Sequence, residues 1–150
     1  MGVEQAYNYH ELSDSVATSG RVEPEQLAQL GAAGIEVVIN LMPDSSKYAV
    51  PDEREIVEGQ GIEYFYLPVD FAAPTLADYE SFLRLMTQVG QRKLLIHCAA
   101  NWRVSAFYSR YAIDRGIWSP EQADQFMLSI WQPGDHPPWP QWLEEVACRS

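Results

Sequence analysis

The segment HCAANWRVS, residues 97–105, combines the residue types best suited to chemistry in this chain. Cys98 follows a short apolar run, and Arg103 stands five positions later, where a helical pattern begins. Free N–H groups in such a loop and at a helix N-terminus form a cradle for an anion, and an arginine fork fits a tetrahedral oxyanion. The same groups favour a nucleophilic cysteine thiolate. The expected anion-binding loop consists of Ala99, Ala100, Asn101, Trp102 and Arg103.

The elements that would position this loop alternate between strands and helices. The hydrophobic pattern predicts strands at 16–20, 35–41, 62–69 and 93–97, the first of them at a sheet edge. Helices are predicted at 24–33, 52–61, 75–90, from the loop to 116, 119–131 and from about 141. This alternation indicates an α/β fold with a largely parallel central sheet flanked by helices, in which ligands bind beyond the carboxyl ends of the strands. Cys98 follows such a strand end.

Length and composition limit the classes of protein that are plausible. The 150 residues are 47% hydrophobic and 21% charged, so we expect residues 1–150 to form one globular domain. Ten Lys and Arg against 21 Asp and Glu give a net charge of -11, the wrong sign for nucleic acid or an anionic membrane surface. Two cysteines cannot form a disulfide framework, and no apolar run reaches 18 residues, which predicts a cytoplasmic protein. Neither a metal-ligand pattern nor a glycine-rich cofactor motif stands out.

With its order of segments, the chain resembles the protein tyrosine phosphatase superfamily, nearest the dual-specificity branch and related bacterial phosphatase-like domains. The segments that carry the resemblance are ATSGRVEPEQL, VVINL, YLPVDFAAPT and LIHCAANWRVSAF. The resemblance implies that Cys98 attacks phosphorus, Arg103 binds the oxyanion, His97 orients the loop and the Ser105 hydroxyl helps the thiolate leave. It also implies hydrolysis of a phosphomonoester through a cysteinyl-phosphate intermediate, without a cofactor.

The resemblance further implies that Asp70 is the general acid, because an aspartate on a loop after an earlier strand protonates the leaving oxygen in this family. The alternative reading is an exposed loop aspartate without a catalytic role. Asp70 follows the predicted strand at 62–69, so its loop should emerge at the same sheet edge as Cys98.

The spacing departs from the family pattern, since four residues separate Cys98 from Arg103 where the family has five. Either the loop is one residue shorter with Arg103 in its role, or Val104 takes the arginine position. Asn101 stands where the family commonly has glycine, a position that can need a positive φ, which Asn tolerates.

Two other functions fit the shortened loop. Four residues is also the spacing in rhodanese-like sulfurtransferases, which would carry a Cys98 persulfide, and a tight ring of donors suits one sulfur atom. An anion-binding module without turnover is the second alternative. His97, Asp70 and the order of segments favour the phosphatase, because persulfide transfer has no oxygen leaving group that needs an acid.

Several neighbouring residues have two readings each. Glu53 and Glu55 flank Arg54 in a predicted helix, and one of the two carboxylates could pair with Arg103. Charged residues in a helix more commonly lie on its solvent-exposed face without such a role. Trp102 could stack on a substrate or pack beside it, whereas Trp131, Trp139 and Trp142 read as core anchors. The expected ligand is a phosphorylated substrate of unknown class, or phosphate or sulfate in the loop. The sequence favours no oligomeric state.

Overall fold

The computed structural model describes residues 2–149 and contains one five-stranded sheet. The strands are β1 (His10–Glu11), β2 (Val16–Ser19), β3 (Val37–Asn40), β4 (Glu63–Tyr66) and β5 (Leu94–His97). The helices are α1 (Pro24–Leu27), α2 (Glu53–Glu58), α3 (Leu76–Val89), α4 (Trp102–Asp114), α5 (Pro120–Leu128) and α6 (Trp139–Cys148), with the 3-10 turns η1 (Val3–Gln5) and η2 (Pro133–Asp135).

The sheet is parallel apart from its first strand, in the order β1-β2-β5-β3-β4. The expected α/β architecture with a largely parallel sheet is therefore confirmed. The prediction that residues 16–20 form an edge strand is wrong, because the two-residue β1 pairs antiparallel with β2 and takes the edge. β5 lies in the middle of the sheet, so the residue that follows it emerges centrally at the carboxyl edge.

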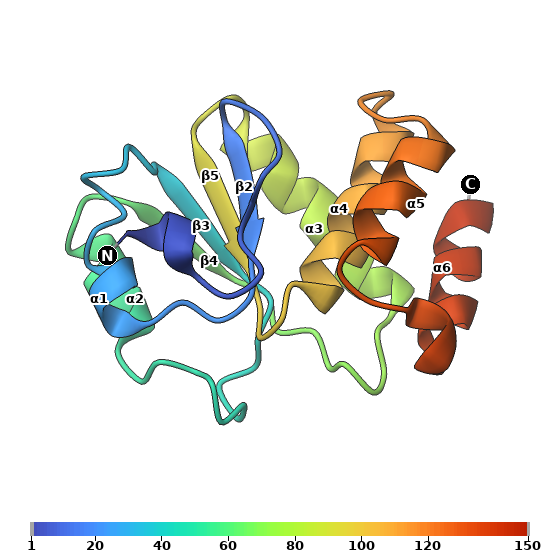
Figure 1. Cartoon of the computed structure of the whole chain (residues 1–150), viewed down its shortest axis with the longest axis horizontal. Helices are drawn as coiled ribbons and strands as arrows, with labels where there is room; N and C mark the ends of the chain where they lie inside the picture. Colours follow the sequence, from blue (N-terminus) through green and yellow to red (C-terminus); the bar gives the residue numbers. More distant parts are fainter. Residues whose placement is uncertain (1, 150) are drawn as a thin grey trace.

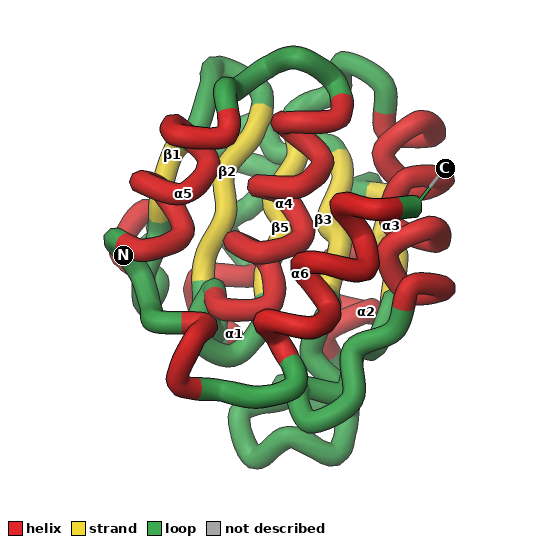
Figure 2. The backbone as a smooth tube through the Cα atoms, turned by 90° about the vertical axis from the view of Figure 1, so that its right-hand side faces the viewer, coloured by secondary structure: helices red, strands yellow, loops and turns green. Residues whose placement is uncertain are grey.

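Side chains of the inner strands alternate between two hydrophobic cores. Val37 and Ile39 of β3 belong to the core under α3, α4 and α6, and Val38 between them belongs to the core under α1 and α2. Figure 1 shows α1 and α2 on one side of the sheet and the longer helices on the other, and Figure 2 shows α3 to α6 covering that second face. A strand covered on both faces explains why VVIN is apolar nearly throughout.

Local signals account for most element boundaries. Thr75 and Asp78 form the capping box at the start of α3, and Ser119 caps α5, as their positions before helical patterns predict. The helix expected over 24–33 is shorter: α1 ends at Leu27, and the chain continues to Gly34 in tight i→i+3 turns. The Gln60 side chain takes both partners of the bond that would continue the helix: it accepts from the N–H of Gly31 at 2.7 Å and donates to Leu27 O at 2.7 Å.

The C-terminal tryptophans anchor the last segment, as expected. Trp131, Trp139 and Trp142 are all buried, and α6 begins two residues before the expected position. Within residues 2–149, no helix has the length and apolar character needed to cross a bilayer.

Candidate active site

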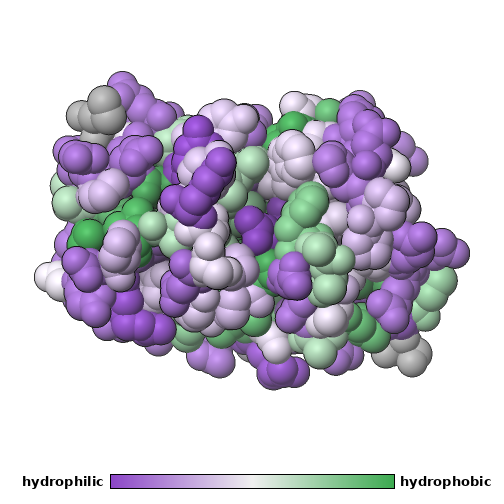
Figure 3. Space-filling view, turned by 90° about the horizontal axis from the view of Figure 1, so that it is seen from below, coloured by the Kyte–Doolittle hydropathy of each residue, from purple (hydrophilic) through white to green (hydrophobic). Residues whose placement is uncertain are grey.

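The loop after β5 forms the floor of a hollow at the carboxyl edge of the sheet. The hollow has a volume of about 220 Å³. Its lining residues are Phe71, Cys98, Ala99, Ala100, Trp102 and Arg103. Cys98 is fully buried, and its N–H donates to Ser19 O of β2 at 3.3 Å. Figure 3, which looks onto this end of the molecule from below, shows hydrophobic and hydrophilic side chains around a recess in the middle of the face.

Backbone N–H groups around Cys98 are free to bind a ligand. Within residues 2–149, five of them donate to no protein acceptor. They belong to Ala99, Ala100, Trp102, Arg103 and Val104. The last three form the first turn of α4, whose N–H groups have no partner inside the helix. Free N–H groups at the positive end of a helix dipole are the arrangement that we expect from the sequence for an anion site.

Asn101 holds the loop in its shape. Its φ of 67° is left-handed, as expected for a residue in the family's glycine position. Its side-chain amide donates to Asn8 O at 2.9 Å and to Thr18 Oγ1 at 3.0 Å. Asn8 donates in return to Ala100 O at 3.0 Å. The N-terminal segment therefore braces the loop from the side of β2.

Gly20 permits this close approach of the two segments. It pairs with Ala100, and the next residue, Arg21, donates its N–H to Ala99 O at 2.9 Å. A Cβ atom at position 20 would lie 2.8 Å from Ala99 O and 2.9 Å from Ala100 Cα. Only glycine fits here without a shift of the backbone.

Arg103 faces the hollow, whereas Val104 does not. The Arg103 guanidinium donates to Val69 O at 2.9 Å and lies 5.9 Å from the centre of the Phe71 ring, and its Nε has no partner within residues 2–149. Val104 is fully buried in the core. Of the two alignments left open by the sequence, the geometry favours the shorter loop with Arg103 beside Cys98.

His97 is held from the other side of the sheet. Its Nε2 lies 2.5 Å from Glu53 Oε2, and both side chains are at most 5% exposed. The pairing of a helical carboxylate with Arg103 is wrong: Glu53 pairs with His97, and Arg54 pairs with Glu58. Burial, followed by the charge of Glu53, raises the pKa of the adjacent Tyr64, which keeps that hydroxyl protonated.

Within residues 2–149, the Ser105 hydroxyl makes no hydrogen bond with Cys98. Its hydroxyl donates to Trp102 O at 3.0 Å and accepts a hydrogen bond from Trp131 Nε1 at 3.0 Å. The arrangement differs from the supporting role expected for this hydroxyl. With Arg103 in the arginine position, Val104 is the residue that directly follows it, so Ser105 faces the core of the helical layer.

Asp70 precedes Phe71 in the chain and is not among the residues that line the hollow. It is exposed, and its Oδ1 accepts from the N–H of Ala72 at 2.9 Å. The residues on either side contact the site, because Val69 O accepts from Arg103 and Phe71 lines the hollow. The loop that carries Asp70 is thus tied to the arginine of the cysteine loop.

An aromatic cluster beside the hollow was not predicted. Trp102 stacks on Trp131 with ring centres 5.1 Å apart, and the His136 ring lies 4.9 Å from Trp102. Phe71 contacts all three rings at 5.8 Å. These residues come from three distant segments, and no periodic pattern in the sequence marks them as neighbours.

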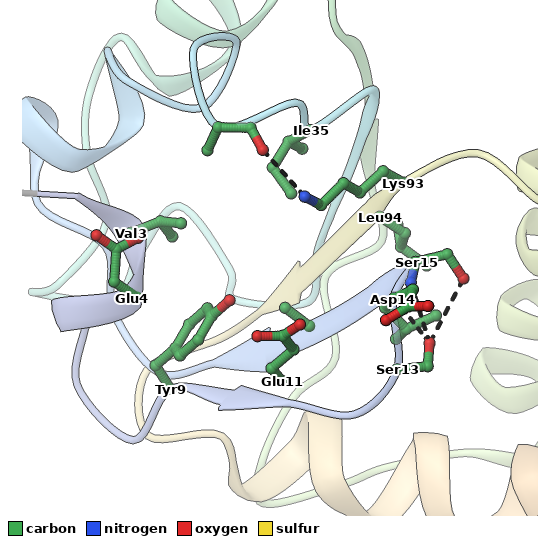
Figure 4. Close-up of a pocket in the computed structure, with 13 residues that line it drawn as sticks. Val3, Glu4, Tyr9, Glu11, Ser13, Asp14, Ser15, Ile35, Lys93 and Leu94 are labelled. Carbon is green, nitrogen blue, oxygen red and sulfur yellow. Dashed lines mark hydrogen bonds between the residues drawn. The ribbon is translucent and has the colours of Figure 1, made fainter.

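A second hollow, of about 280 Å³, lies at the opposite end of the sheet, where β2 and β5 begin. Figure 4 shows Glu4, Glu11 and Asp14 among its lining residues, and Lys93 turned to a backbone carbonyl. Burial, followed by Glu11 and Glu4, raises the pKa of Tyr9 there. Its negative charge makes this hollow unsuitable for phosphate. Residues 2–149 contain no group of three or more side chains able to hold a metal ion.

Several solved structures that share this fold are described as phosphatases or candidate phosphatases. A candidate phosphatase of the DUF442 type from Shewanella putrefaciens CN-32 is 36% identical, with a TM-score of 0.87 over 97% of this chain and 94% of that one. TpbA of P. aeruginosa is 19% identical, with a TM-score of 0.73 over 93% and 84% of the two chains. The kinase associated phosphatase KAP is 18% identical, with a TM-score of 0.72 over 98% and 100%.

The comparisons do not favour the sulfurtransferase reading of the shortened loop, because the matched proteins are of the phosphatase type. No curated protein matches the sequence. The model of a family described as "DSP-PTPase phosphatase fused to NAD+ Kinase" matches residues 4–134, which include the whole cysteine loop, and the chain therefore belongs to this family of phosphatases.

Proposed function

We propose that Cys98 and Arg103 hydrolyse a phosphomonoester in two steps. The Cys98 thiolate attacks phosphorus, an S–P bond forms, and the bond from phosphorus to the ester oxygen breaks. Water then attacks the cysteinyl-phosphate, which releases inorganic phosphate and regenerates the thiolate. Arg103 and the free N–H groups of the loop stabilise the negative oxygens in both transition states.

One observation carries this proposal: Cys98, Arg103 and five free backbone donors belong to one short loop and the helix turn that follows it, around one hollow. The three non-bridging oxygens of a phosphoryl group can accept several hydrogen bonds at once. A single persulfide sulfur would leave most of these donors without a ligand atom to bind.

We assign the general acid to Asp70. Its carboxyl group would protonate the leaving oxygen in the first step and take a proton from water in the second. The support is positional, since Asp70 stands between Val69 and Phe71, which both contact the site. The carboxyl group is exposed and accepts one hydrogen bond, from the N–H of Ala72, which leaves its second oxygen available to a bound ester.

The substrate is a phosphorylated molecule, and we propose an aryl phosphate such as phosphotyrosine. Phe71 and Trp102 line the hollow and are both partly exposed, so they offer flat apolar surfaces to an aromatic leaving group. A structure of TpbA in complex with phosphotyrosine, 17% identical to this chain, has the same fold. We also propose a cytoplasmic location, since both cysteines are free and the nucleophile needs a reduced thiol.

The first test compares the two cysteines. Cys98→Ser should abolish hydrolysis of p-nitrophenyl phosphate, and Cys148→Ser, a change at an exposed position on α6, should leave it unaltered. Arg103→Lys should lower kcat/KM by about 10²-fold or more, because lysine lacks the fork that binds two oxygens. Hydrolysis that survives in Cys98→Ser would refute the mechanism. Transfer of thiosulfate sulfur to cyanide without ester hydrolysis would establish the sulfurtransferase.

The second test addresses Asp70. Asp70→Asn should slow hydrolysis of an alkyl phosphate by about 10²- to 10⁴-fold and that of p-nitrophenyl phosphate by less, because a good leaving group departs without a proton. Asp124→Asn, at an exposed position on α5, is the matched control. Equal rates for Asp70→Asn and the parent on both esters would remove Asp70 from the mechanism and leave Cys98 unaffected.

A further inference from the structure

A groove of about 390 Å³ lies beside the cysteine loop and has no part in the two-step mechanism. It runs between the segment after β2, which carries Arg21, and the loop from β3 to α2, which carries Lys47 and Tyr48. Figure 1 shows this second loop, in teal, projecting beyond the carboxyl edge of the sheet. One wall of the groove therefore projects from the carboxyl edge of the sheet, the edge at which Cys98 lies.

Two cations of the groove are held by aromatic rings. The Arg21 guanidinium lies 4.5 Å from the centre of the Tyr7 ring and 4.6 Å from that of Tyr48. The Lys47 ammonium lies 5.2 Å from the centre of the Tyr48 ring. Both tyrosines are more than a third exposed. Such stacking fixes the position of a guanidinium and leaves its N–H edge available to a ligand.

The charges of these cations are not neutralised within the described residues. Four other arginines form ion pairs with carboxylates. They are Arg54, Arg92, Arg110 and Arg149. Neither Arg21 nor Lys47 has a carboxylate within ion-pair distance in residues 2–149, and Glu23, which also lines the groove, pairs with neither. In a chain of net charge -11, two free cations beside the active loop are a local exception.

The backbone joins this groove directly to the active loop. Arg21 N–H donates to Ala99 O at 2.9 Å, and Ala99 follows Cys98. Standard backbone dimensions then put the Arg21 nitrogen within about 9 Å of the Cys98 Cα atom. Residues of an extended peptide are spaced about 3.3 Å apart. The backbone that carries the Arg21 side chain therefore lies within about three extended residues of the backbone that carries Cys98, close enough for one bound peptide to span the hollow and the groove.

We propose that Arg21 and Lys47 form a specificity subsite that selects phosphopeptides with an acidic residue next to the phosphorylated one. The inference rests on the proposed phosphatase function and names its substrate class. The aryl phosphate occupies the hollow at Cys98, and the neighbouring carboxylate pairs with Arg21 and Lys47. The ring faces of Tyr7 and Tyr48 cover the apolar part of that side chain.

The experiment uses two phosphotyrosine peptides that differ only in having Glu or Gln on both sides of the phosphotyrosine. For the parent protein, kcat/KM should be about tenfold higher with the Glu peptide, the gain expected from partly exposed charge pairs. The preference should shrink at 1 M salt, where the screening length falls to about 3 Å. Arg21→Met combined with Lys47→Met should reduce the ratio to about one. Arg84→Met removes a positive charge from an exposed position on α3 and should keep the ratio of the parent.

The outcomes separate this inference from the proposed function. If the parent hydrolyses both peptides equally well, the subsite is refuted and the phosphatase mechanism stands. A preference for Glu that survives in the double variant also refutes the subsite. If the parent hydrolyses neither the peptides nor p-nitrophenyl phosphate, the proposed function itself fails.

Discussion

Replacement of Asn101 separates the contributions of hydrogen bonding and of backbone conformation to the shape of the cysteine loop. The residue has a left-handed backbone conformation, with φ at 67°, and its amide donates one buried and one partly buried hydrogen bond. Asn101→Gly removes the hydrogen bonds and keeps the backbone conformation accessible. Asn101→Ala removes the same bonds and adds the strain of an alanine at positive φ. The two variants therefore differ chiefly in backbone strain.

The magnitudes follow from these contacts. Loss of the two hydrogen bonds lowers the free energy of unfolding by about 2 kcal/mol. Both substitutions also remove the buried Asn101 Oδ1, which has no partner within residues 2–149, and its removal offsets about 1 kcal/mol of that loss. In Asn101→Gly, the greater flexibility of the unfolded chain adds about 0.5–1 kcal/mol to the loss of stability. Alanine instead adds about 1–2 kcal/mol of left-handed strain. We expect losses of about 2 kcal/mol for Asn101→Gly and about 3 kcal/mol for Asn101→Ala.

Urea denaturation at pH 7 measures both losses, and p-nitrophenyl phosphate reports whether the loop still forms. The glycine variant should keep more activity than the alanine variant. Asn8→Gly is the control, because Asn8 also has a positive φ of 51° and donates one bond to the loop. It should cost about 1–2 kcal/mol. An alanine variant as stable as the glycine variant would refute the strain argument, and an Asn101→Gly variant as stable as the parent would refute the role of the hydrogen bonds.

Three further changes test the supports of the loop and of the helical layer. Gly20→Ala should cost about 1–3 kcal/mol and lower activity, because its Cβ would meet Ala99 O at 2.8 Å; melting and turnover of the variant measure both effects. Glu53→Ala should lower the free energy of unfolding by about 1–3 kcal/mol in urea denaturation, since it leaves a buried His97 nitrogen without its hydrogen-bond partner, and Glu53→Gln should cost less; equal losses would contradict a hydrogen-bonding role. Burial disfavours ionisation of Asp114, but one tyrosine hydroxyl and two arginines outweigh it and lower its pKa. A lowered pKa stabilises the folded state above the ordinary aspartate value near 4, and this contribution is lost as the pH falls through the folded value. Asp114→Asn should therefore cost about 1–2 kcal/mol at pH 7 and progressively less below pH 4, whereas a loss independent of pH would refute the charge argument.

The sequence was sufficient to predict the strands, helix ends and turns that depend on residues close together in the chain. The apolar run VVIN predicts a strand covered on both faces, and Thr75 with Asp78 predicts the start of α3. The positive φ of Asn101 was also predictable, because few other residue types tolerate it in a glycine position. Each of these features depends on neighbours within a few residues.

The sequence was not sufficient for contacts between distant segments. Glu53 pairs with His97 across 44 positions, and nothing in the helix pattern distinguishes it from Glu55. The edge position of β1 depends on a two-residue strand without a periodic signal. The groove at Arg21 depends on tyrosines at positions 7 and 48, which meet only when the sheet has formed.

The shortened loop shows why spacing alone did not indicate the reaction. A count of intervening residues treats the loop as the only source of donors, and four residues then suggest a ring suited to a smaller ligand. In the structure, α4 begins at Trp102, before Arg103 is reached, so the first turn of the helix supplies N–H groups at Trp102, Arg103 and Val104. Asn101 turns the chain into that helix without a further residue, because its left-handed conformation is held by its own hydrogen bonds. The capacity of such a site depends on where the helix starts as well as on the number of residues between cysteine and arginine.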